Sequence, residues 1–382
     1  MVGKRMVLSG FNNYPQTICD VFPAYRYSDL FNMQNPSIAR GLGGSYGDAA
    51  LNETGQVVLL KYLNRFLEFD RARGILTAEA GVSLLEILKL ILPSDWFLPV
   101  SPGTQYVTLG GCVAADVHGK NHYHAGSMSA FVRWFELITA DGKTLRCSAK
   151  ENSEVFWATI GGMGLTGIIS VISLQLLSVS SNKMWVNNSA VNGLENILEV
   201  LGQDNNQYKY KIAWLDTLAK GKDLGRAIIM SANHAIKDEV ADENNSSFST
   251  GWSAILPRYF PKGILNPVMI KAFNYIYYQK MLRNSQALNS LASYFYPLDK
   301  LKYWQRAYGK RGFIQYQCVF PKETSLEGMK SILEKIHTTR NHIFLATVKR
   351  LGDSNAAHLS FPMPGFSLAL DIPIKNNEIF LK

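Results

Sequence analysis

The sequence contains little cysteine, and its cysteines form no recognisable pair. Among 382 residues there are four, and they lie far apart without a C-x-x-C spacing: Cys19, Cys112, Cys147 and Cys318. This distribution argues against a disulfide scaffold or a zinc ribbon and fits a protein with reduced thiols. The sequence also lacks a recognised nucleic-acid-binding module, so we expect no nucleic-acid partner.

The chain also lacks an apolar run of the kind that targets or crosses a membrane. Residues 1–16 contain no apolar core long enough for a secretory signal peptide. Residues 160–177 are uncharged but include four glycines and many β-branched residues. We therefore expect a glycine turn followed by a buried strand over 167–176, not a transmembrane helix, and a cytoplasmic location.

One long region of the chain lacks acidic residues. Residues 244–298, here called the basic aromatic segment, contain no aspartate or glutamate but carry five lysines or arginines and eleven aromatic residues. Such a segment suits anionic lipid headgroups or an amphipathic ligand that bears a phosphate. A basic helix packed on its own domain is the alternative. We expect this segment to form a flap that makes peripheral contact with the inner face of the membrane.

The overall composition is that of a folded globular protein. Hydrophobic residues make up 47% of the chain and charged residues 18%, with a net charge of +9. The length exceeds what one core usually serves, so we expect two domains. The polar stretch 178–182 separates a region of alternating strands and helices from a different pattern beyond it, which places the boundary after residue 178.

Local signals predict several elements on each side of that boundary. Hairpin turns are expected at 71–74 and at Asp141-Gly142, and a capping box at Ser83–Glu86 opens a helix that Pro93 stops. The remaining predictions are a helix capped by Asn152, a helix from Asn266-Pro267 to about Arg283, a strand over 313–320, and a capping box at Thr324–Glu327.

Three glycine-rich segments are the most informative part of the sequence. Residues 101–127 hold five glycines and three histidines, residues 40–48 hold a second cluster, and residues 161–167 a third. Glycine permits close backbone approach and positive φ, as is needed where backbone N–H groups surround a large ligand. None of the three has the G-x-G-x-x-G or P-loop spacing. We therefore favour a nucleotide cofactor held in another way over turns alone.

These motifs resemble the FAD-binding domain of the vanillyl-alcohol oxidase superfamily, also described as the PCMH type. The segments that carry the resemblance are 41–48, 102–111, 118–122 and 161–167. Segments 213–216, 221–226, 296–299, 308–317 and 359–362 resemble, more closely, the decaprenylphosphoryl-β-D-ribose 2′-oxidase family. The resemblance covers nearly the whole chain.

The resemblance implies an α+β fold of two domains. Residues 1–178 would form the FAD-binding domain from two α/β subdomains, and residues 179–382 a substrate domain with an antiparallel sheet. Gly44 precedes Ser45 where relatives with covalent FAD often have the linking histidine, so we expect non-covalent FAD. The implied FAD contacts are Arg40, Gly41, Leu42, Gly43, Gly44, Ser45, Tyr46, Gly47, Asp48, Gly103, Thr108, Leu109, Gly110, Gly111, Ala115, His118 and Ile169.

His118, His122 and His124 have the spacing of metal ligands, but only Asp116 and Cys112 lie close enough in sequence to complete a zinc site. We expect no metal. Hydrogen bonds to loop backbone are the plain alternative for these histidines, and the resemblance places His118 beside the flavin as the catalytic candidate.

The resemblance also implies a substrate site and a reaction. The substrate contacts would be Lys120, Trp214, Gln315, Gln317 and Lys349, with the two lysines available to a phosphate. Gln315 and Gln317 lie two residues apart on one strand and so share a face, although a solvent-facing edge is an alternative. The family's cavity cysteine is Ala369 here, and its asparagine is Ser367. Relatives continue beyond the position of Lys382 with a tyrosine and a lysine that approach the flavin, so the catalytic base stays open.

The expected activity is FAD-dependent oxidation of the 2′-hydroxyl of a polyprenyl-phosphoryl-β-D-ribose, with a short-chain reductase completing epimerisation to the arabinose form. The alternatives are a sugar or aldonolactone oxidase that acts on a soluble substrate, and a non-catalytic protein with a flavin-binding fold.

Overall fold

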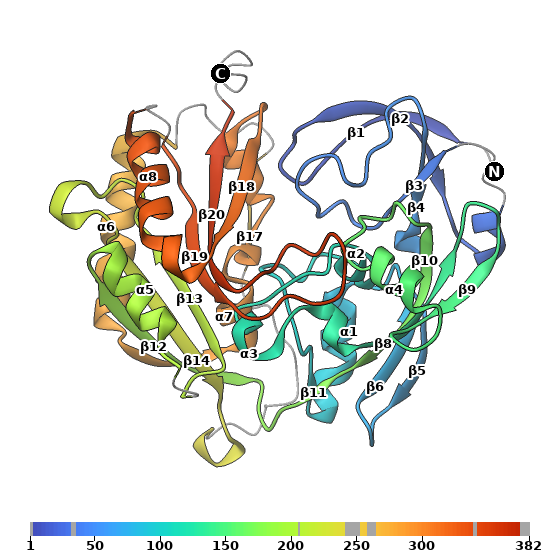
Figure 1. The fold of residues 1–382 in the computed structure, drawn as a ribbon, viewed down its shortest axis with the longest axis horizontal. Coiled ribbons are helices and arrows are strands. Elements are labelled where there is room, and N and C mark those ends of the chain that lie inside the picture. The colour runs from blue at the N-terminus through green and yellow to red at the C-terminus, as the bar shows by residue number, and fades with distance from the viewer. Residues whose placement is uncertain are drawn as a thin grey trace.

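The computed structural model describes residues 3–31, 36–204, 207–240, 253–257, 265–338 and 342–374, apart from the side chain of Lys222. The N-terminal and C-terminal halves lie side by side, each built around β-sheet (Figure 1). This mixture of helices with mainly antiparallel sheets confirms the α+β class. The basic aromatic segment is described only at 253–257 and 265–298, so its residues 244–252 and 258–264 lie outside the described part.

The N-terminal half contains two sheets. The first has the order β1-β2-β4-β3, with β1 antiparallel to β2 and parallel pairing elsewhere. The second is antiparallel throughout, in the order β5-β6-β10-β8-β9. The strands are β1 (Lys4–Ser9), β2 (Gln16–Pro23), β3 (Ser37–Arg40), β4 (Gln56–Leu59), β5 (Phe66–Asp70), β6 (Ile75–Glu79), β8 (Val132–Ile138), β9 (Thr144–Cys147) and β10 (Ile168–Gln175).

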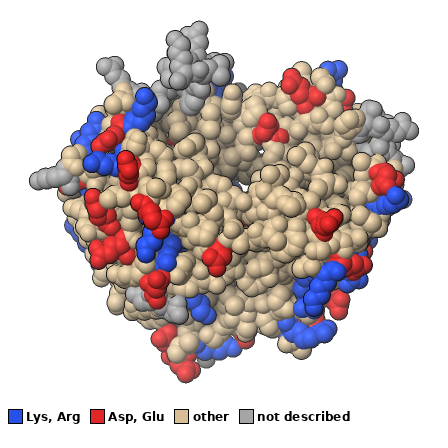
Figure 2. Space-filling model, viewed as in Figure 1, with Lys and Arg blue, Asp and Glu red and all other residues tan. Residues whose placement is uncertain are grey.

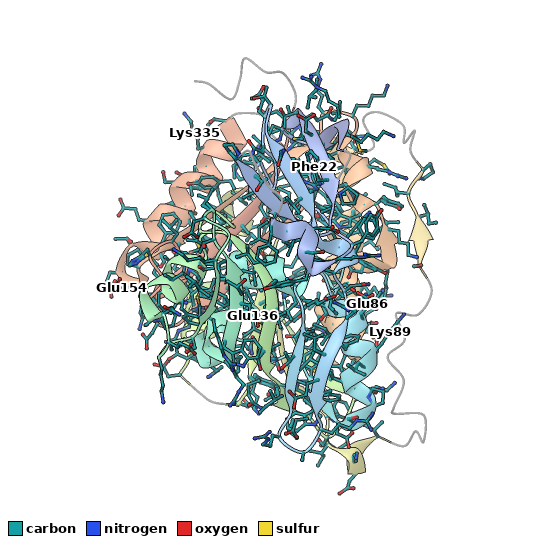
Figure 3. All side chains as sticks on the ribbon, turned by 90° about the vertical axis from the view of Figure 1, so that its right-hand side faces the viewer. Phe22, Glu86, Lys89, Glu136, Glu154 and Lys335 are labelled. Carbon is teal, nitrogen blue, oxygen red and sulfur yellow. The ribbon has the colours of Figure 1, made fainter. Side chains whose placement is uncertain are left out.

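Four short helices accompany these sheets: α1 (Leu84–Ile91), α2 (Leu109–Ala114), α3 (His122–Ala125) and α4 (Ser153–Thr159). Figure 3 looks onto this half, with Glu86 and Lys89 of α1 on one side, Glu154 of α4 on the other, and Glu136 of β8 between them.

The C-terminal half is organised by one seven-stranded antiparallel sheet in the order β16-β12-β14-β13-β19-β20-β18. Its strands are β12 (Lys183–Val191), β13 (Tyr210–Leu215), β14 (Ala227–His234), β16 (Gln286–Ser290), β18 (Phe313–Phe320), β19 (Ala346–Leu351) and β20 (Gly365–Pro373). The helices are α5 (Leu194–Gly202), α6 (Pro267–Arg283), α7 (Leu291–Phe295) and α8 (Ser325–Thr338). Two short pairs, β7 (Trp96–Phe97) with β11 (Leu177–Ser178) and β15 (Ala254–Ile255) with β17 (Leu301–Lys302), complete the strands.

The two faces of the seven-stranded sheet bury different groups. Alternate residues such as Ala213, Val348 and Leu368 pack with α5 and α8 into one apolar core. Because side chains alternate along a strand, their neighbours Trp214 and Lys349 face the opposite side, where they line a cavity together with part of α6. This alternation separates the structural face of the sheet from the face available to a ligand.

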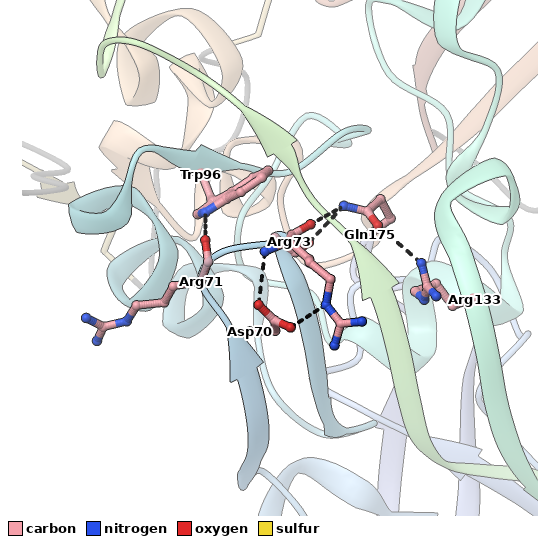
Figure 4. Close-up of polar contacts among 7 residues, drawn as sticks. Asp70, Arg71, Arg73, Trp96, Arg133 and Gln175 are labelled. Atoms are coloured by element: carbon pink, nitrogen blue, oxygen red, sulfur yellow. Dashed lines mark hydrogen bonds and ion pairs between the residues drawn. The ribbon is translucent and has the colours of Figure 1, made fainter.

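Several local predictions are confirmed. Ser83 and Glu86 form the expected capping box on α1, and Asn266 accepts from the N–H of Met269 at the start of α6. Both predicted hairpins form. At the first turn, Asp70 accepts from the backbone N–H of Arg73 at 2.9 Å, and the nearby Trp96 indole donates to the Arg71 carbonyl (Figure 4).

Two capping predictions are wrong. Asn152 adopts a left-handed conformation with φ of 49° and donates its amide to the Arg146 carbonyl, so it does not cap α4. Residues 322–324 already form a helical turn that leads directly into α8, and the Thr324 hydroxyl donates to the Pro321 carbonyl. Thr324 therefore has no N-cap role.

The halves share buried structure. The largest apolar core runs from Phe97 and Leu109 in the N-terminal half to Met184, Tyr210 and Phe295 in the C-terminal half. Division into domains after residue 178 remains a proposal, supported by the separate sheets on either side. Among the described helices, none combines the length and apolar character needed to span a bilayer.

Candidate active site

A cavity of about 2150 Å³ lies between the two halves. One side is formed by the glycine-rich segments of the N-terminal half, and the other by the polar face of the seven-stranded sheet with part of α6. On the molecular face drawn in Figure 2, charged residues lie mostly toward the edges.

The segment after β3 is held in shape by a half-buried arginine. The Arg40 guanidinium donates to the carbonyls of Ser9 and Ala50, at 2.7 and 3.2 Å. Burial lowers the pKa of Arg40, yet its two carbonyl partners stabilise the charge. The backbone that follows turns through Gly43, with φ of +71°, a conformation that favours glycine.

The second glycine segment packs directly against the first. A Cβ on Gly41 would lie 2.2 Å from the Thr108 hydroxyl oxygen, and one on Gly110 would lie 2.7 Å from the Ala80 side chain. The Thr108 hydroxyl also accepts from the N–H of Gly111. Glycine is therefore required at these two positions, because a Cβ would collide with the Thr108 side chain or with Ala80.

These segments fit a flavin nucleotide. The space beside Gly103, which lines the cavity, is empty to 4 Å where a Cβ would point, so its backbone is open to a ligand. Ala115, Gly164, Gly167 and Ile169 line the same cavity.

Of the predicted FAD contacts, Arg40 to Tyr46, Gly103, Thr108, Gly110, Gly111, Ala115, His118 and Ile169 line the cavity, whereas Gly47, Asp48 and Leu109 do not. Leu109 is instead part of the apolar core.

His118 lies where the two halves meet. Its Nδ1 is 3.3 Å from the Lys349 amine, and its Nε2 is 3.3 Å from the Gln317 amide nitrogen. The Phe361 ring stacks on the imidazole, with centroids 5.8 Å apart. Burial, followed by the charges of Lys349 and His122, holds the pKa of His118 well below 6.5, so the imidazole stays neutral.

Lys120 lines the cavity and is held by backbone carbonyls of the C-terminal half. Its ammonium donates to the carbonyls of Tyr294 and Phe295 and lies 4.2 Å from the centroid of the Tyr294 ring. Burial and the Lys349 charge lower the pKa of Lys120 to about 7. These contacts join the glycine segment to α7, and contact with a substrate phosphate stays a prediction.

The other two histidines of the motif are separated in the structure. His122 is buried and its Nδ1 accepts from the N–H of Gly352 at 3.0 Å, whereas His124 is exposed. Asp116 accepts from Asn355 and Ser360. Through these contacts the long connection between β19 and β20 reaches across to the N-terminal half (Figure 1) and brings Phe361 onto His118.

Sequence reasoning missed one buried acid in the cavity region. Asp371 is 1% exposed and accepts at Oδ1 from the Gln315 amide at 3.0 Å. Its Oδ2 and the Tyr308 hydroxyl are both buried without a hydrogen-bond partner among the described residues. Burial raises the pKa of Asp371 to about 7, although the hydrogen bond from Gln315 acts in the opposite direction.

The predicted substrate residues share this cavity. Trp214, Gln315, Gln317, Lys349 and Lys120 all line it. Gln315 and Gln317 therefore line the cavity, and they do not face open solvent alone. An apolar and aromatic part of the cavity adjoins them, formed by Trp214, Phe273, Tyr277, Met281 and Phe344.

Comparison with known proteins gives this geometry a chemical context. A family model described as FAD binding domain matches residues 14–148. The chain is 37% identical over 343 residues to the decaprenylphosphoryl-β-D-ribose oxidase of Mycolicibacterium smegmatis, which covers 88% of this chain and 74% of that protein.

Two further relatives differ in how much they share. An uncharacterized protein of Streptomyces coelicolor is 28% identical over 77% of this chain and 82% of its own length. The L-gulonolactone oxidase of Scyliorhinus torazame is 31% identical over 38% of this chain and 33% of its own length. The chain belongs to the decaprenylphosphoryl-β-D-ribose oxidase family and is an FAD-dependent oxidoreductase.

Proposed function

We propose that this protein oxidises the 2′-hydroxyl of a polyprenyl-phosphoryl-β-D-ribose to the 2′-keto sugar. The observation that carries the proposal is the single cavity in which a glycine-lined side faces the polar group Gln315, Gln317, His118 and Lys349. The similarity to the mycobacterial oxidase extends over both sides of this cavity. Bound FAD would supply the hydride acceptor for the alcohol.

The protein's own residues would bind and orient the sugar. Gln315 is held by Asp371 through its amide nitrogen, which leaves its carbonyl oxygen as an acceptor for a sugar hydroxyl. Gln317 and His118 offer further polar atoms beside it. Fixing a secondary alcohol at one position relative to the flavin is the main contribution that such a site makes to the rate.

The aromatic part of the cavity suits the first units of a polyprenyl chain. Phe273 and Tyr277 stack with centroids 5.9 Å apart, and Tyr277 meets Trp214 edge to face at 4.9 Å. Lys280 and Lys300 line the same cavity and add positive charge for a phosphate. We propose these two lysines as phosphate contacts in addition to the predicted Lys120, because the Lys349 amine instead faces the His118 imidazole.

Anaerobic flavin reduction tests the substrate. The FAD-loaded protein is mixed with a short-chain polyprenyl-phosphoryl-β-D-ribose, with free ribose, or with L-gulono-1,4-lactone, and the flavin absorbance is followed. The proposal expects bleaching by the first compound alone. Bleaching by the lactone or free sugar, with none by the lipid-linked sugar, would establish the soluble-substrate alternative, which the partial similarity to L-gulonolactone oxidase favours.

We further propose that α6 docks on an anionic membrane surface. Only Ile270 and Asn274 of this helix are buried. Val268 is 75% and Ile276 65% exposed, and Lys271 is also exposed among them. An exposed apolar surface with basic residues and no acids fits the interface of an anionic bilayer, and α6 also lines the cavity into which a lipid substrate would pass.

Vesicle sedimentation tests this docking. With vesicles containing anionic lipid, the wild type is expected to sediment, and the combined replacement of Lys271, Lys280 and Arg283 by Gln, or of Val268 and Ile276 by Ser, is expected to reduce binding at least tenfold. Val7→Ser, a similarly exposed change far from α6, is the matched control. Undiminished sedimentation of both variants would remove the proposal.

The keto product requires a reductase to complete epimerisation. We propose a short-chain reductase as the functional partner, because returning hydride to the opposite face of the ketone gives the arabinose configuration. In a coupled assay, such a reductase with its nicotinamide cofactor should convert the product to the arabinose form, and recovery of ribose alone would contradict the partnership.

A further inference from the structure

Lys349 is a lysine with no acidic partner. It lies in the cavity wall on β19, opposite Ser367 of β20, and its recorded side-chain contact is with the His118 imidazole. Within the described part of the chain, no carboxylate forms an ion pair with it. A cation in such surroundings is destabilised unless an anion enters, so the neutral amine becomes accessible.

The titratable groups that interact with Lys349 supply no negative charge. His118, His122 and Lys120 are the titratable groups that interact with Lys349, and all are bases. The carboxylates of Asp116 and Asp353 act on His122, whereas burial alone shifts the pKa of Lys349.

Asp116 is already saturated by donors: Ser127, Asn355, Ser360 and the N–H of Ser129. Burial accordingly lowers the pKa of Lys349 to about 8.

The hydrogen-bond pattern of His118 depends on whether Lys349 is an ammonium or a neutral amine. A neutral imidazole carries one proton, so one ring nitrogen donates and the other accepts. If the Gln317 amide nitrogen donates to Nε2, then Nδ1 carries the proton and must donate to Lys349, which must then be a neutral amine. If Lys349 is an ammonium, it donates to Nδ1, Nε2 carries the proton, and the Gln317 amide must turn to present its oxygen.

Two of the self-consistent states of these three side chains differ by one proton on Lys349. In one, Lys349 is neutral, His118 is protonated at Nδ1, and Gln317 donates. In the other, Lys349 is charged, His118 is protonated at Nε2, and Gln317 accepts. The imidazole stays neutral in both states, as its low pKa requires. The second state holds one proton more than the first, and that proton is on Lys349.

We propose that Lys349 is the terminal proton acceptor of the alcohol oxidation and that His118 relays the proton to it. This proposal rests on the proposed function. Bound FAD would accept the hydride from the carbinol C–H bond. For the O–H bond to break at the same centre, the Gln317 amide first turns away from Nε2; the proton then passes to the freed Nε2 lone pair, and the Nδ1 proton passes to the Lys349 amine. The carbonyl forms, Lys349 becomes an ammonium, and Gln317 turns its oxygen toward Nε2.

Nuclear magnetic resonance of the FAD-loaded, oxidised protein without substrate tests the resting network. With lysine labelled at Cε and histidine labelled with ¹⁵N, Lys349 should titrate near pH 8, while exposed lysines stay protonated to about pH 10. His118 should change from the Nε2–H to the Nδ1–H tautomer with the same midpoint, without forming an imidazolium. Lys349→Met should remove the tautomer change, and Lys89→Met, an exposed change on α1, should not.

Flavin reduction under single-turnover conditions tests the relay. The rate constant should fall about tenfold for each pH unit below 8 in the wild type. In Lys349→Met it should be at least a hundredfold lower and independent of pH, and Lys349→Arg, which cannot lose its proton, should be equally slow. A Lys349 that titrates above pH 10, or a wild-type pH profile retained by Lys349→Met, would overturn the proposal.

The two proposals fail separately. If the coupled titration is found but polyprenyl-phosphoryl ribose does not reduce the flavin, the substrate is wrong and the resting network stands. If that substrate reduces the flavin but Lys349 titrates normally, the function stands and the relay is wrong.

Discussion

The buried carboxyl of Asp371 should make the free energy of unfolding depend on pH. The pKa of this carboxyl rises from 3.8 to about 7 because the side chain is buried. One pKa unit corresponds to about 1.4 kcal/mol, so ionising Asp371 in the folded protein costs about 4 kcal/mol of folding free energy. Because the folded-state pKa is raised, the stability that protonated Asp371 contributes is complete below pH 3.8. It is lost progressively as the pH rises from 3.8 through 7.

Asp371→Asn should therefore stabilise the protein at neutral and alkaline pH. The asparagine keeps an oxygen acceptor for the Gln315 amide and places an N–H where Oδ2 lies in the wild type. The nearby Tyr308 hydroxyl, which has no hydrogen-bond partner among the described residues, can accept from this N–H. The advantage over wild type should grow by about 1.4 kcal/mol for each pH unit between 4 and 7 and then level off at about 4 kcal/mol. If the C-terminal half unfolds as a unit, the melting temperature should rise by about 8 to 16 °C at pH 8.

The assay is thermal unfolding of wild type and Asp371→Asn from pH 4.5 to 8.5, with and without FAD. Asp238→Asn, an exposed acid on the same half, is the control and should show no such trend. A difference between wild type and Asp371→Asn that is constant across this range would refute the reasoning, because a constant difference does not come from ionisation of Asp371.

Three further predictions concern the cofactor and α6. Gly41→Val should leave the purified protein with less than a tenth of the wild-type FAD, since a Cβ at this position would lie 2.2 Å from the Thr108 hydroxyl; flavin absorbance per protein measures it, and full occupancy would contradict the packing. Acid precipitation should release all FAD into the supernatant, because Gly44 replaces a linking histidine, whereas a yellow pellet would show a covalent bond. Asp216→Ala should lower the free energy of unfolding by about 3 kcal/mol and speed proteolysis within α6, because buried Asp216 binds both Arg226 and Asn274. The same change at Asp70, whose ion pair with Arg73 is at the surface, should have little effect, and equal effects of the two changes would argue against this anchor.

The sequence predicted elements with strong local signals and missed those that depend on pairing. Caps such as Ser83 and Asn266 act within four residues, so they can be recognised from the chain alone. Strands β12 and β14 were not anticipated, because their pattern becomes clear only when they pair with each other across the sheet. Asn152 was misassigned because its side chain has a competing partner in the Arg146 carbonyl.

The same distinction applies to the candidate site. The glycine segments predicted a backbone-lined cavity, because glycine lacks a Cβ and so permits close approach whatever its neighbours are. Lys120 and Lys349 were both expected at a phosphate, and only the packing directs one toward the carbonyls of α7 and the other toward His118. Asp371 could not be singled out, since its role depends on the register that places it opposite Gln315.

Flavin reduction with a polyprenyl-phosphoryl-β-D-ribose that carries deuterium at C2′ tests directly whether the protein oxidises this carbon. We expect the deuterated substrate to bleach the bound FAD several times more slowly than the unlabelled one. Its 2′-keto product should have lost the deuterium. Bleaching at an unchanged rate with deuterium retained in the product, or no bleaching by either substrate, would contradict the proposed oxidation.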